Sequence, residues 1–323
     1  MTDTTEGLSY ADAGVDIGAY ERMLERVKPL IAGTQGEAVV TGVGPFAGLY
    51  RVPGGYLAAS ADGVGTKIKV AVAHGRHRGI GADLVNHCVN DIATAGARPL
   101  FFLDYFAAGR VDAGVFEEVM AGLAEACAAN GCALLGGETA EMPGVYALGD
   151  YDLAGFIVGW VDAGRWRHPV REGDLLVGLP STGLHTNGYS LARRVFEEVP
   201  LDHVYDELSR PLGDVLLEPH LSYLAELQRL EWKAAAHITG GGLLGNLPRV
   251  LPEGLAARLD RGSWPVPPIF GLIAERGRVP EEEMLGTFNM GLGMVLVCSK
   301  PPPGHPVVGR VVPQSGAQRV VLA

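Results

Sequence analysis

Residues 56–67 read Tyr-Leu-Ala-Ala-Ser-Ala-Asp-Gly-Val-Gly-Thr-Lys, and this stretch combines a structural pattern with a chemical one. Its first six residues predict a strand, which Asp62 follows directly. Gly63 and Gly65 let the backbone turn sharply and approach a ligand closely, because no Cβ intrudes. Lys67 adds a point charge that suits a phosphate group. The combination is typical of a site for a nucleotide with magnesium.

Two further segments of the first half place acids beside glycine or asparagine, where the pattern otherwise predicts buried helix or strand. Asn90 and Asp91 end one apolar segment, and Gly136, Gly137 and Glu138 end another. If these segments end at the same edge of one sheet, Asp91 and Glu138 lie close to Asp62. The sequence therefore predicts that three carboxylates, from distant parts of the chain, share one site.

The three carboxylates, those of Asp62, Asp91 and Glu138, would need a cation. Two unit charges about 4 Å apart repel by about 4 kcal/mol at an effective dielectric of about 20, so such a group is stable only when protonated, separated or bound to metal. Oxygen ligands favour Mg²⁺, which completes its shell with water and phosphate. Each acid alone is better explained as a turn residue or helix cap. Together they favour a magnesium site.

Composition limits the class of protein. The chain has 323 residues and a formal net charge of −11, which disfavours a nucleic acid or an anionic membrane as the main partner. Residues 1–6 lack the basic and apolar regions of a signal peptide, and no apolar run approaches the length of a membrane span. The cysteines show no C-x-x-C spacing and are interpreted as reduced thiols of a cytoplasmic protein: Cys88, Cys127, Cys132 and Cys298.

Strands and helices alternate in the first half, which predicts a mixed α/β fold. We expect helices at 17–31 (with Asp16 as cap), 79–95 and 113–130, and strands at 38–50, 55–61, 99–106, 132–136 and 151–161. The stretch 162–169 breaks this rhythm and predicts a boundary between domains 1–164 and 165–323. In the second domain we expect helices from about 187, at 213–230 and at 241–250, a loop at 264–268, and strands at 175–179, 255–259, 293–298 and 307–312.

Two segments of the second domain join a strand to a helix through polar residues and glycines. Residues 181–190 contain His185 and Asn187, which could bind a sugar phosphate at a helix N-terminus, although the same residues could simply begin the helix. His185 could also transfer protons, but a single histidine in a loop is more often merely exposed. The second segment repeats the pattern with His237, Thr239, Gly240 and Gly241.

Residues 41–48, Thr-Gly-Val-Gly-Pro-Phe-Ala-Gly, could donate backbone N–H groups to phosphates, or could be only a turn. They do not fit G-x-G-x-x-G, and the chain contains no G-x-x-x-x-G-K-[ST] segment, so neither common nucleotide motif is present. No G-x-S-x-G segment supports a serine hydrolase either.

Taken together, the motifs closely resemble those of phosphoribosylformylglycinamidine cyclo-ligases, also called aminoimidazole ribonucleotide synthetases. The resemblance runs nearly end to end. It is carried by the segments 8–17 (LSYADAGVDI), 62–67 (DGVGTK), 79–85 (GIGADLV), 88–91 (CVND), 99–105 (PLFFLDY), 136–144 (GGETAEMPG), 185–190 (HTNGYS), 237–242 (HITGGG) and 287–294 (TFNMGLGM). In one departure, Pro45 and Ala47 stand where the family usually pairs glycines around a phenylalanine, which predicts a stiffer loop.

The resemblance implies a fold, a reaction and a set of roles. It implies an N-terminal domain that binds ATP and Mg²⁺ and pairs with a second copy into a shared barrel, and a C-terminal α/β domain that binds substrate. The reaction is ATP-dependent ring closure of formylglycinamidine ribonucleotide to aminoimidazole ribonucleotide, with release of ADP and phosphate. The catalytic residues that the resemblance implies are Asp91, His185 and Lys67, and the implied metal ligands are Asp62, Asp91 and Glu138. The implied contacts with the nucleotide come from Asp62, Gly63, Gly65, Thr66, Lys67, Asn90, Gly136, Gly137 and Glu138. The implied contacts with the substrate come from His185, Asn187, His237, Thr239, Gly240 and Gly241.

Two other functions stay open on the sequence. The wider superfamily includes selenophosphate synthetase, thiamine monophosphate kinase and a hydrogenase maturation protein, so a different small-molecule phosphotransferase is one alternative. A non-catalytic nucleotide-binding dimer is the other, although its binding function alone would not require all the acids.

Overall fold

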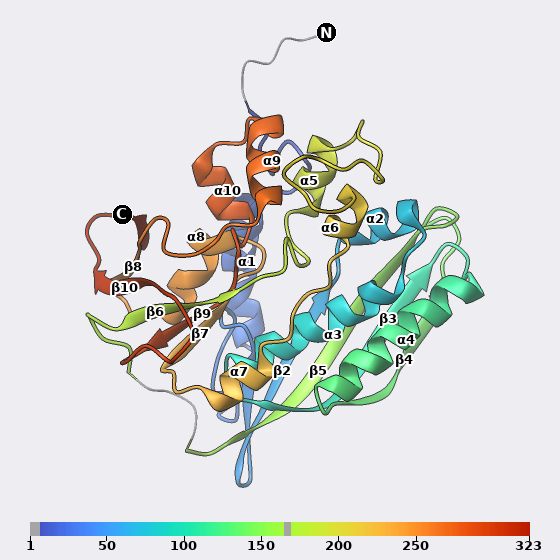
Figure 1. Cartoon of the computed structure of the whole chain (residues 1–323). Coiled ribbons are helices and arrows are strands. Elements are labelled where there is room, and N and C mark those ends of the chain that lie inside the picture. Colours follow the sequence, from blue (N-terminus) through green and yellow to red (C-terminus); the bar gives the residue numbers. More distant parts are fainter. Residues whose placement is uncertain (1–6, 165–168) are drawn as a thin grey trace.

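The computed structural model describes residues 7–164 and 169–323, which form two sheets with helices packed around them (Figure 1). The N-terminal half contains α1 (Ile17–Ala32), β1 (Gly48–Val52), β2 (Gly55–Gly63), α2 (Lys67–His74), α3 (Arg78–Ala93), β3 (Arg98–Ala108), α4 (Ala113–Ala129), β4 (Ala133–Glu141) and β5 (Tyr151–Asp162). The C-terminal half contains β6 (Leu175–Pro180), α5 (Tyr189–Val195), α6 (Leu212–Leu216), α7 (Leu224–Arg229), β7 (Ala234–His237), α8 (Gly242–Asn246), the 3₁₀ helix η1 (Leu247–Val250), β8 (Leu255–Leu259), α9 (Pro268–Gly277), α10 (Glu281–Thr287), β9 (Leu292–Cys298), β10 (Val307–Pro313) and β11 (Val320–Leu322).

The N-terminal sheet has the strand order β1-β2-β5-β3-β4, in which only β3 and β4 are parallel neighbours. Helices α3 and α4 lie on one face of it (Figure 1). Because side chains alternate along a strand, Phe102 and Phe106 of β3 point to this face, where they are almost completely buried. Gly81 and Gly122 let the two helices touch, since a Cβ at either would fall within 2.2 Å of a carbonyl oxygen on the other helix. Helix α3 is thereby held firmly over the middle of the sheet.

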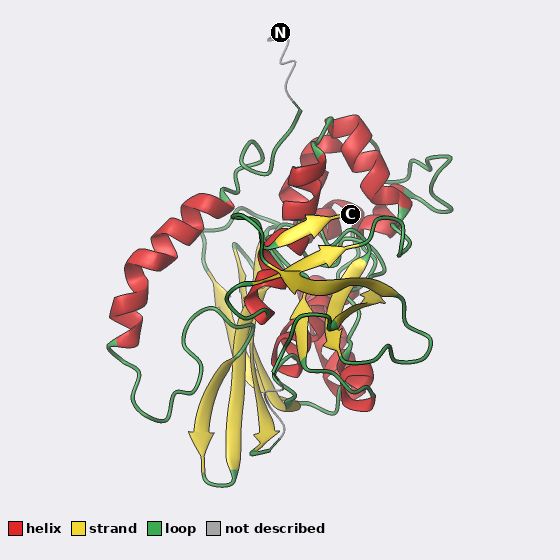
Figure 2. Ribbon diagram, turned by 90° about the vertical axis from the view of Figure 1, so that its left-hand side faces the viewer, coloured by secondary structure: helices red, strands yellow, loops and turns green. Residues whose placement is uncertain are grey.

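Among residues 7–164 and 169–323, no helix covers the opposite face of this sheet. Tyr50, Tyr105 and Phe156 point away from α3 and α4 and are 52, 37 and 41% exposed. Helix α1 lies apart from the rest of the molecule (Figure 2) and also leaves apolar side chains in solvent, among them Met23 and Leu30. Apolar side chains left exposed together on one face of a folded chain are typical of a protein–protein contact.

The C-terminal sheet has the order β11-β8-β10-β6-β9-β7, and its neighbours are antiparallel except β8 and β11. Strand β9, which lies between β6 and the edge strand β7, is buried along its whole length. The predicted mixed α/β class is confirmed. The predicted domain boundary adjoins residues 165–168, which lie outside the described residues, so the boundary stays a prediction. In the described part of the chain, no helix is both long enough and apolar enough to cross a membrane.

Several elements differ from the predictions. The strand expected at 132–136 continues to Glu141, and the helix expected at 213–230 is two short helices, α6 and α7, joined by an extended segment. Helices α2, α9 and α10 and strand β11 were not expected as separate elements, whereas the strand expected to end at His237 is present as β7. A single helix over 213–230 is interrupted by Pro219, which cannot donate the backbone hydrogen bond that a helix interior needs. Residues 218–223 are held instead by Lys67 of α2 and by Asn86 and Asn90 of α3.

Candidate functional site

Two of the three predicted carboxylates lie together beneath α3. Asp62 is near the end of β2, on the face that α3 covers, and its Oδ2 lies 3.2 Å from Nε2 of His87. Asp91 follows His87 by one helical turn, so both side chains project from the same face of α3. Ser60 of β2 donates a hydrogen bond of 2.9 Å to Oδ2 of Asp91, which ties the strand to the helix.

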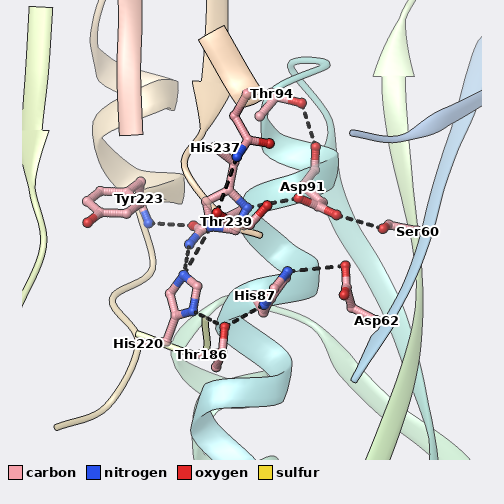
Figure 3. A network of polar contacts seen from close by, with 12 residues as sticks. Ser60, Asp62, His87, Asp91, Thr94, Thr186, His220, Tyr223, His237 and Thr239 are labelled. Atoms are coloured by element: carbon pink, nitrogen blue, oxygen red, sulfur yellow. Dashed lines mark hydrogen bonds and ion pairs between the residues drawn. The ribbon is translucent and has the colours of Figure 1, made fainter. Parts of the chain in front are cut away.

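Residues of the C-terminal half close the other side of this site (Figure 3). Nδ1 of His237, at the end of β7, lies 2.8 Å from Oδ1 of Asp91, and its Nε2 lies 3.0 Å from Nε2 of His220. The hydroxyl of Thr186 lies 2.8 Å from Nδ1 of His87 and 3.3 Å from Nδ1 of His220. A continuous polar network therefore runs from one carboxylate to the other through three imidazoles and one hydroxyl.

The network separates charged groups from neutral ones. Burial alone would raise the pKa of Asp62, but the adjacent His87 overcomes it and lowers the pKa to about 2. Burial would lower the pKa of His87, but the charge and hydrogen bond of Asp62 raise it to about 9. Burial lowers the pKa of His237 despite its contact with Asp91, and it lowers the pKa of His220 well below its usual range. One imidazolium thus supplies part of the positive charge that the two carboxylates need.

Glu138 does not join this group, which corrects the predicted cluster of three carboxylates to a pair. Glu138 is paired in register with Tyr105, on the uncovered face of the sheet, whereas Asp62 is paired with Gly155 on the face that α3 covers. The two residues are also three strands apart, or about 14 Å. The spacing of the acids in the sequence does not predict this separation. The face of the sheet on which Glu138 lies depends on how β4 is paired with β3. Gly136 and Gly137 lie in the same exposed edge strand, β4, rather than in a phosphate loop.

Lys67 also lies away from the carboxylate pair. Its ammonium group is completely buried, 2.7 Å from Oδ2 of Asp83 on α3, and it donates a hydrogen bond of 2.7 Å to the carbonyl of Glu218. Burial lowers the pKa of Lys67 and raises that of Asp83 to about 6. Within this chain Lys67 joins α2 to α3, so its predicted contact with phosphate gains no support. Its neighbours Gly63, Gly65 and Thr66 remain exposed at the strand end.

Asn90 joins the two halves, whereas His185 packs within the C-terminal half. The amide of Asn90 donates to the carbonyl of Leu221 at 2.8 Å and accepts from the backbone N–H of Tyr223 at 2.8 Å. His185 is buried and stacks on His220 with a centroid separation of 4.1 Å. The predicted contacts of Asn90 with nucleotide and of His185 with substrate are not tested and stay predictions.

The two predicted substrate segments lie next to each other. A Cβ on Gly240 would lie 3.3 Å from Oδ1 of Asn187, so the turn after β7 faces the turn before α5. The amide of Asn246 on α8 donates to the carbonyls of Thr239 and Gly240, at 3.2 and 3.1 Å, and thereby fixes the turn. Gly241 has a φ of 91°, a left-handed conformation that favours glycine.

A cleft of about 1430 Å³ adjoins the network. Thr94 lines it and donates to the backbone carbonyl of Asp91 at 2.6 Å, and Phe46 lines it beneath the guanidinium of Arg249, which lies 3.9 Å from the ring centroid. Arg249 also donates to the carbonyl of Gly44 at 2.8 Å and so holds the 41–48 loop. Lys233 also lines the cleft but is paired with Asp174 at 2.7 Å. The other charged lining residues are three basic and one acidic, in a chain of net charge −11, so the cleft suits an anionic ligand: Arg171, Arg249, Lys300 and Glu231.

The sequence reasoning missed His87, His220, Asn246 and Arg249. A signal for His87 was present: Asp83, His87, Asn90 and Asp91 recur at helical spacing, so α3 carries a polar stripe inside an otherwise apolar helix. Such a stripe, when buried, indicates a structured polar site. No comparable local pattern surrounds the other three residues.

Comparisons with known proteins agree with this architecture. The models of the AIR synthase related protein family match residues 44–161 (N-terminal domain) and 171–302 (C-terminal domain). Among solved structures of similar fold, "AaThiL complexed with AMPPCP and TMP" has a TM-score of 0.64 at 13% identity, covering 95% of this chain and 93% of that one. The hydrogenase maturation protein HypE in complex with ATP has a TM-score of 0.58 at 17% identity, covering 94 and 91%.

Curated relatives are much closer in sequence. A phosphoribosylformylglycinamidine cyclo-ligase of Myxococcus xanthus is 54% identical over 91% of this chain and 89% of its own length. One from Paraburkholderia phymatum is 48% identical over 92 and 86%. At this identity and coverage, the chain belongs to the phosphoribosylformylglycinamidine cyclo-ligase family.

Proposed function

We propose that this chain catalyses the ATP-dependent ring closure of formylglycinamidine ribonucleotide to 5-aminoimidazole ribonucleotide, releasing ADP and phosphate, a step of purine synthesis. The observation that carries the proposal is the paired carboxylates Asp62 and Asp91 beside a basic cleft, in a chain whose curated relatives bear this enzyme's name. ATP use is consistent with the family and with the ATP-bound neighbour of the same fold.

The donor atoms fit Mg²⁺ carried by ATP. Asp62 and Asp91 each offer carboxylate oxygens, the ligands that Mg²⁺ prefers, and phosphates and water can complete its shell. Bound there, the ion would neutralise charge on the transferring phosphoryl group. Ser60 and His237 hold the two oxygens of Asp91 in place, and His87 orients Asp62, so the ligands are positioned before nucleotide binds.

The reaction we propose has two steps. The formyl oxygen of the substrate attacks the γ-phosphoryl group of ATP, which forms an imidate phosphate and converts a poor leaving group into a good one. The ribosyl-bearing nitrogen then attacks the formyl carbon and expels phosphate as the ring closes. Arg249 lines the cleft in which the anionic substrate would lie, so it would hold the substrate while water is excluded. The turn formed by Thr239 and Gly240 is fixed by Asn246 and would contribute backbone N–H groups to the same substrate.

The direct test is an assay of purified protein with Mg-ATP and formylglycinamidine ribonucleotide that follows ADP and the aromatic amine together. We expect the two products in equal amounts. ADP with phosphorylated substrate but no aminoimidazole would instead identify a kinase, the activity named for relatives of the same fold. ATP binding without any turnover would identify a nucleotide-binding regulator.

We also propose that the chain works as a homodimer joined through the uncovered face of the N-terminal sheet. The support is the row of exposed apolar side chains on that face, including Tyr105 and Phe156, together with the exposed apolar side of α1. A second copy would bury these side chains and complete a barrel. The four cysteines are free and buried, which supports a reducing compartment such as the cytoplasm.

A charge on the uncovered face should separate the dimer. We expect the wild-type protein to have twice the 34.0 kDa mass of one chain, and Phe156→Asp to have the mass of one chain, because a buried carboxylate without a partner is costly. Light scattering after size exclusion measures this. Val204→Asp, at an exposed apolar residue of the other half, should leave the mass unchanged. A monomeric wild type would contradict the proposal.

A further inference from the structure

The buried imidazoles around Asp91 provide nitrogen ligands that the proposed magnesium site does not use. One potential ligand atom from each of His87, Asp91 and His237 lies within 4.8 Å of the other two, and all three residues are buried. We infer that these three residues form a binding site for a divalent first-row transition metal ion, with Zn²⁺ as the representative ligand. The inference goes beyond ring closure and does not depend on it.

Rigid elements supply the three ligands. His87 and Asp91 are four residues apart on α3, the spacing that places two ligands on one face of a helix. Helix α3 is fixed against α4 by Gly81 and Gly122. His237 ends β7, which pairs with the fully buried β9. Ligand atoms around one tetrahedral zinc ion are about 3.3 Å apart, given Zn–N bonds of about 2.0 Å, so atoms that lie up to 4.8 Å apart must approach by as much as about 1.5 Å when the ion binds.

The ligands also have the supporting contacts that metal sites require. A metal-binding histidine generally engages its second nitrogen in a hydrogen bond, which fixes the ring. His87 has this contact through Thr186 at 2.8 Å, and His237 has it through His220 at 3.0 Å. The carboxylate of Asp91 is held by Ser60 at 2.9 Å. These contacts lie behind the ligands rather than between them.

The donor set determines which ion the site prefers. Two imidazole nitrogens with one carboxylate suit Zn²⁺, Co²⁺ and Ni²⁺, whereas Mg²⁺ prefers oxygen ligands. Asp62, which lies 3.2 Å from Nε2 of His87, is placed to give a fourth ligand once the ion displaces the proton between them. A transition metal ion here would occupy Asp91, the carboxylate that we propose for magnesium. Zn²⁺ should therefore weaken the binding of Mg-ATP.

The test uses Co²⁺ as a spectroscopic probe on the full-length protein after removal of metals with a chelator. We expect Co²⁺ to bind one ion per chain with the strong visible bands of a four-coordinate site, Zn²⁺ to abolish the bands, and an approximately 100-fold excess of Mg²⁺ to leave them intact. His87→Asn places a side-chain amide near the position of Nδ1, which makes the supporting hydrogen bond, and removes the ligand atom Nε2. His237→Gln places a side-chain amide near the position of Nε2, which makes the supporting hydrogen bond, and removes the ligand atom Nδ1. Each should weaken binding by at least about 100-fold.

The control variant is His203→Asn, at an exposed histidine outside the network, which should bind Co²⁺ as the wild type does. Absence of one-to-one visible bands in the wild type would overturn the inference, whatever the variants do. Displacement of Co²⁺ by equimolar Mg²⁺, or wild-type affinity in a folded His87→Asn protein, would also overturn it. Because the readout is spectroscopic, failure of the metal test and failure of the ring-closure assay are independent results.

Discussion

Asp91→Asn should abolish turnover while the protein stays folded. The amide keeps nearly the same shape but removes the negative charge that we propose for Mg²⁺, and it presents an N–H group toward either Ser60 or His237. We expect kcat/KM to fall at least about 1000-fold, equivalent to about 4 kcal/mol of transition-state stabilisation. Steady-state kinetics with Mg-ATP measures the loss, and circular dichroism with thermal unfolding checks the fold.

Ser60→Ala is the matched control for this prediction. It removes a hydrogen bond to the same carboxylate and leaves the charge in place, so we expect a loss in kcat/KM of about 10-fold or less. An active Asp91→Asn enzyme would exclude the carboxylate as a metal ligand. Equal losses in the two variants would assign the effect to orientation rather than to charge.

Lys67→Met should lower stability more than it affects catalysis in the protein that remains folded. The substitution leaves Asp83 buried without its cation, and breaking a buried ion pair in this way costs about 3–5 kcal/mol. Urea unfolding measures the free energy, and kcat is determined per folded molecule. The sequence motif alone gives the opposite expectation, since a lysine after a glycine turn is typical of phosphate binding.

The double variant Lys67→Met with Asp83→Leu separates these roles. It replaces both charges by apolar side chains, so part of the lost stability should return, but recovery is incomplete because the buried backbone N–H of His220 loses its acceptor on Asp83. If Lys67 instead neutralises phosphate during the reaction, Lys67→Met would keep its stability and lose kcat, and the double variant would stay inactive.

The elements that the sequence predicted well are those with strong local signals. The first helix follows the apolar spacing after Asp16, which caps it by accepting a hydrogen bond of 2.8 Å from Ala19. Strand β3 follows the apolar run at 99–106, and α3 and α4 match their periodicity within about two residues. In such segments the local pattern and the tertiary contacts agree, so the pattern is sufficient.

The site was predicted only in part, because it depends on register and on contacts between distant segments. Asp62 and Asp91 were correctly brought together, since each ends an apolar element on the same face of the sheet. Glu138 was not, because alternation along β4 turns it to the other face. His220 lies in a segment whose conformation is set by α3, through the carboxylate of Asp83 and the amide of Asn86. No local pattern encodes such a contact.

The contacts of Asn90 have a consequence for how ligands enter and leave. Its amide joins α3 to residues 221 and 223, and the network through His237 joins the same helix to β7. Rotation of one half of the molecule away from the other would break all of these buried hydrogen bonds together, at a cost of about 1–3 kcal/mol for each group left unpaired. The 41–48 loop is likewise attached to the C-terminal half, through Arg249 and through Phe46, which is buried in the apolar core of that half. A ligand must therefore enter through the cleft that already exists between these segments, without separation of the two sheets.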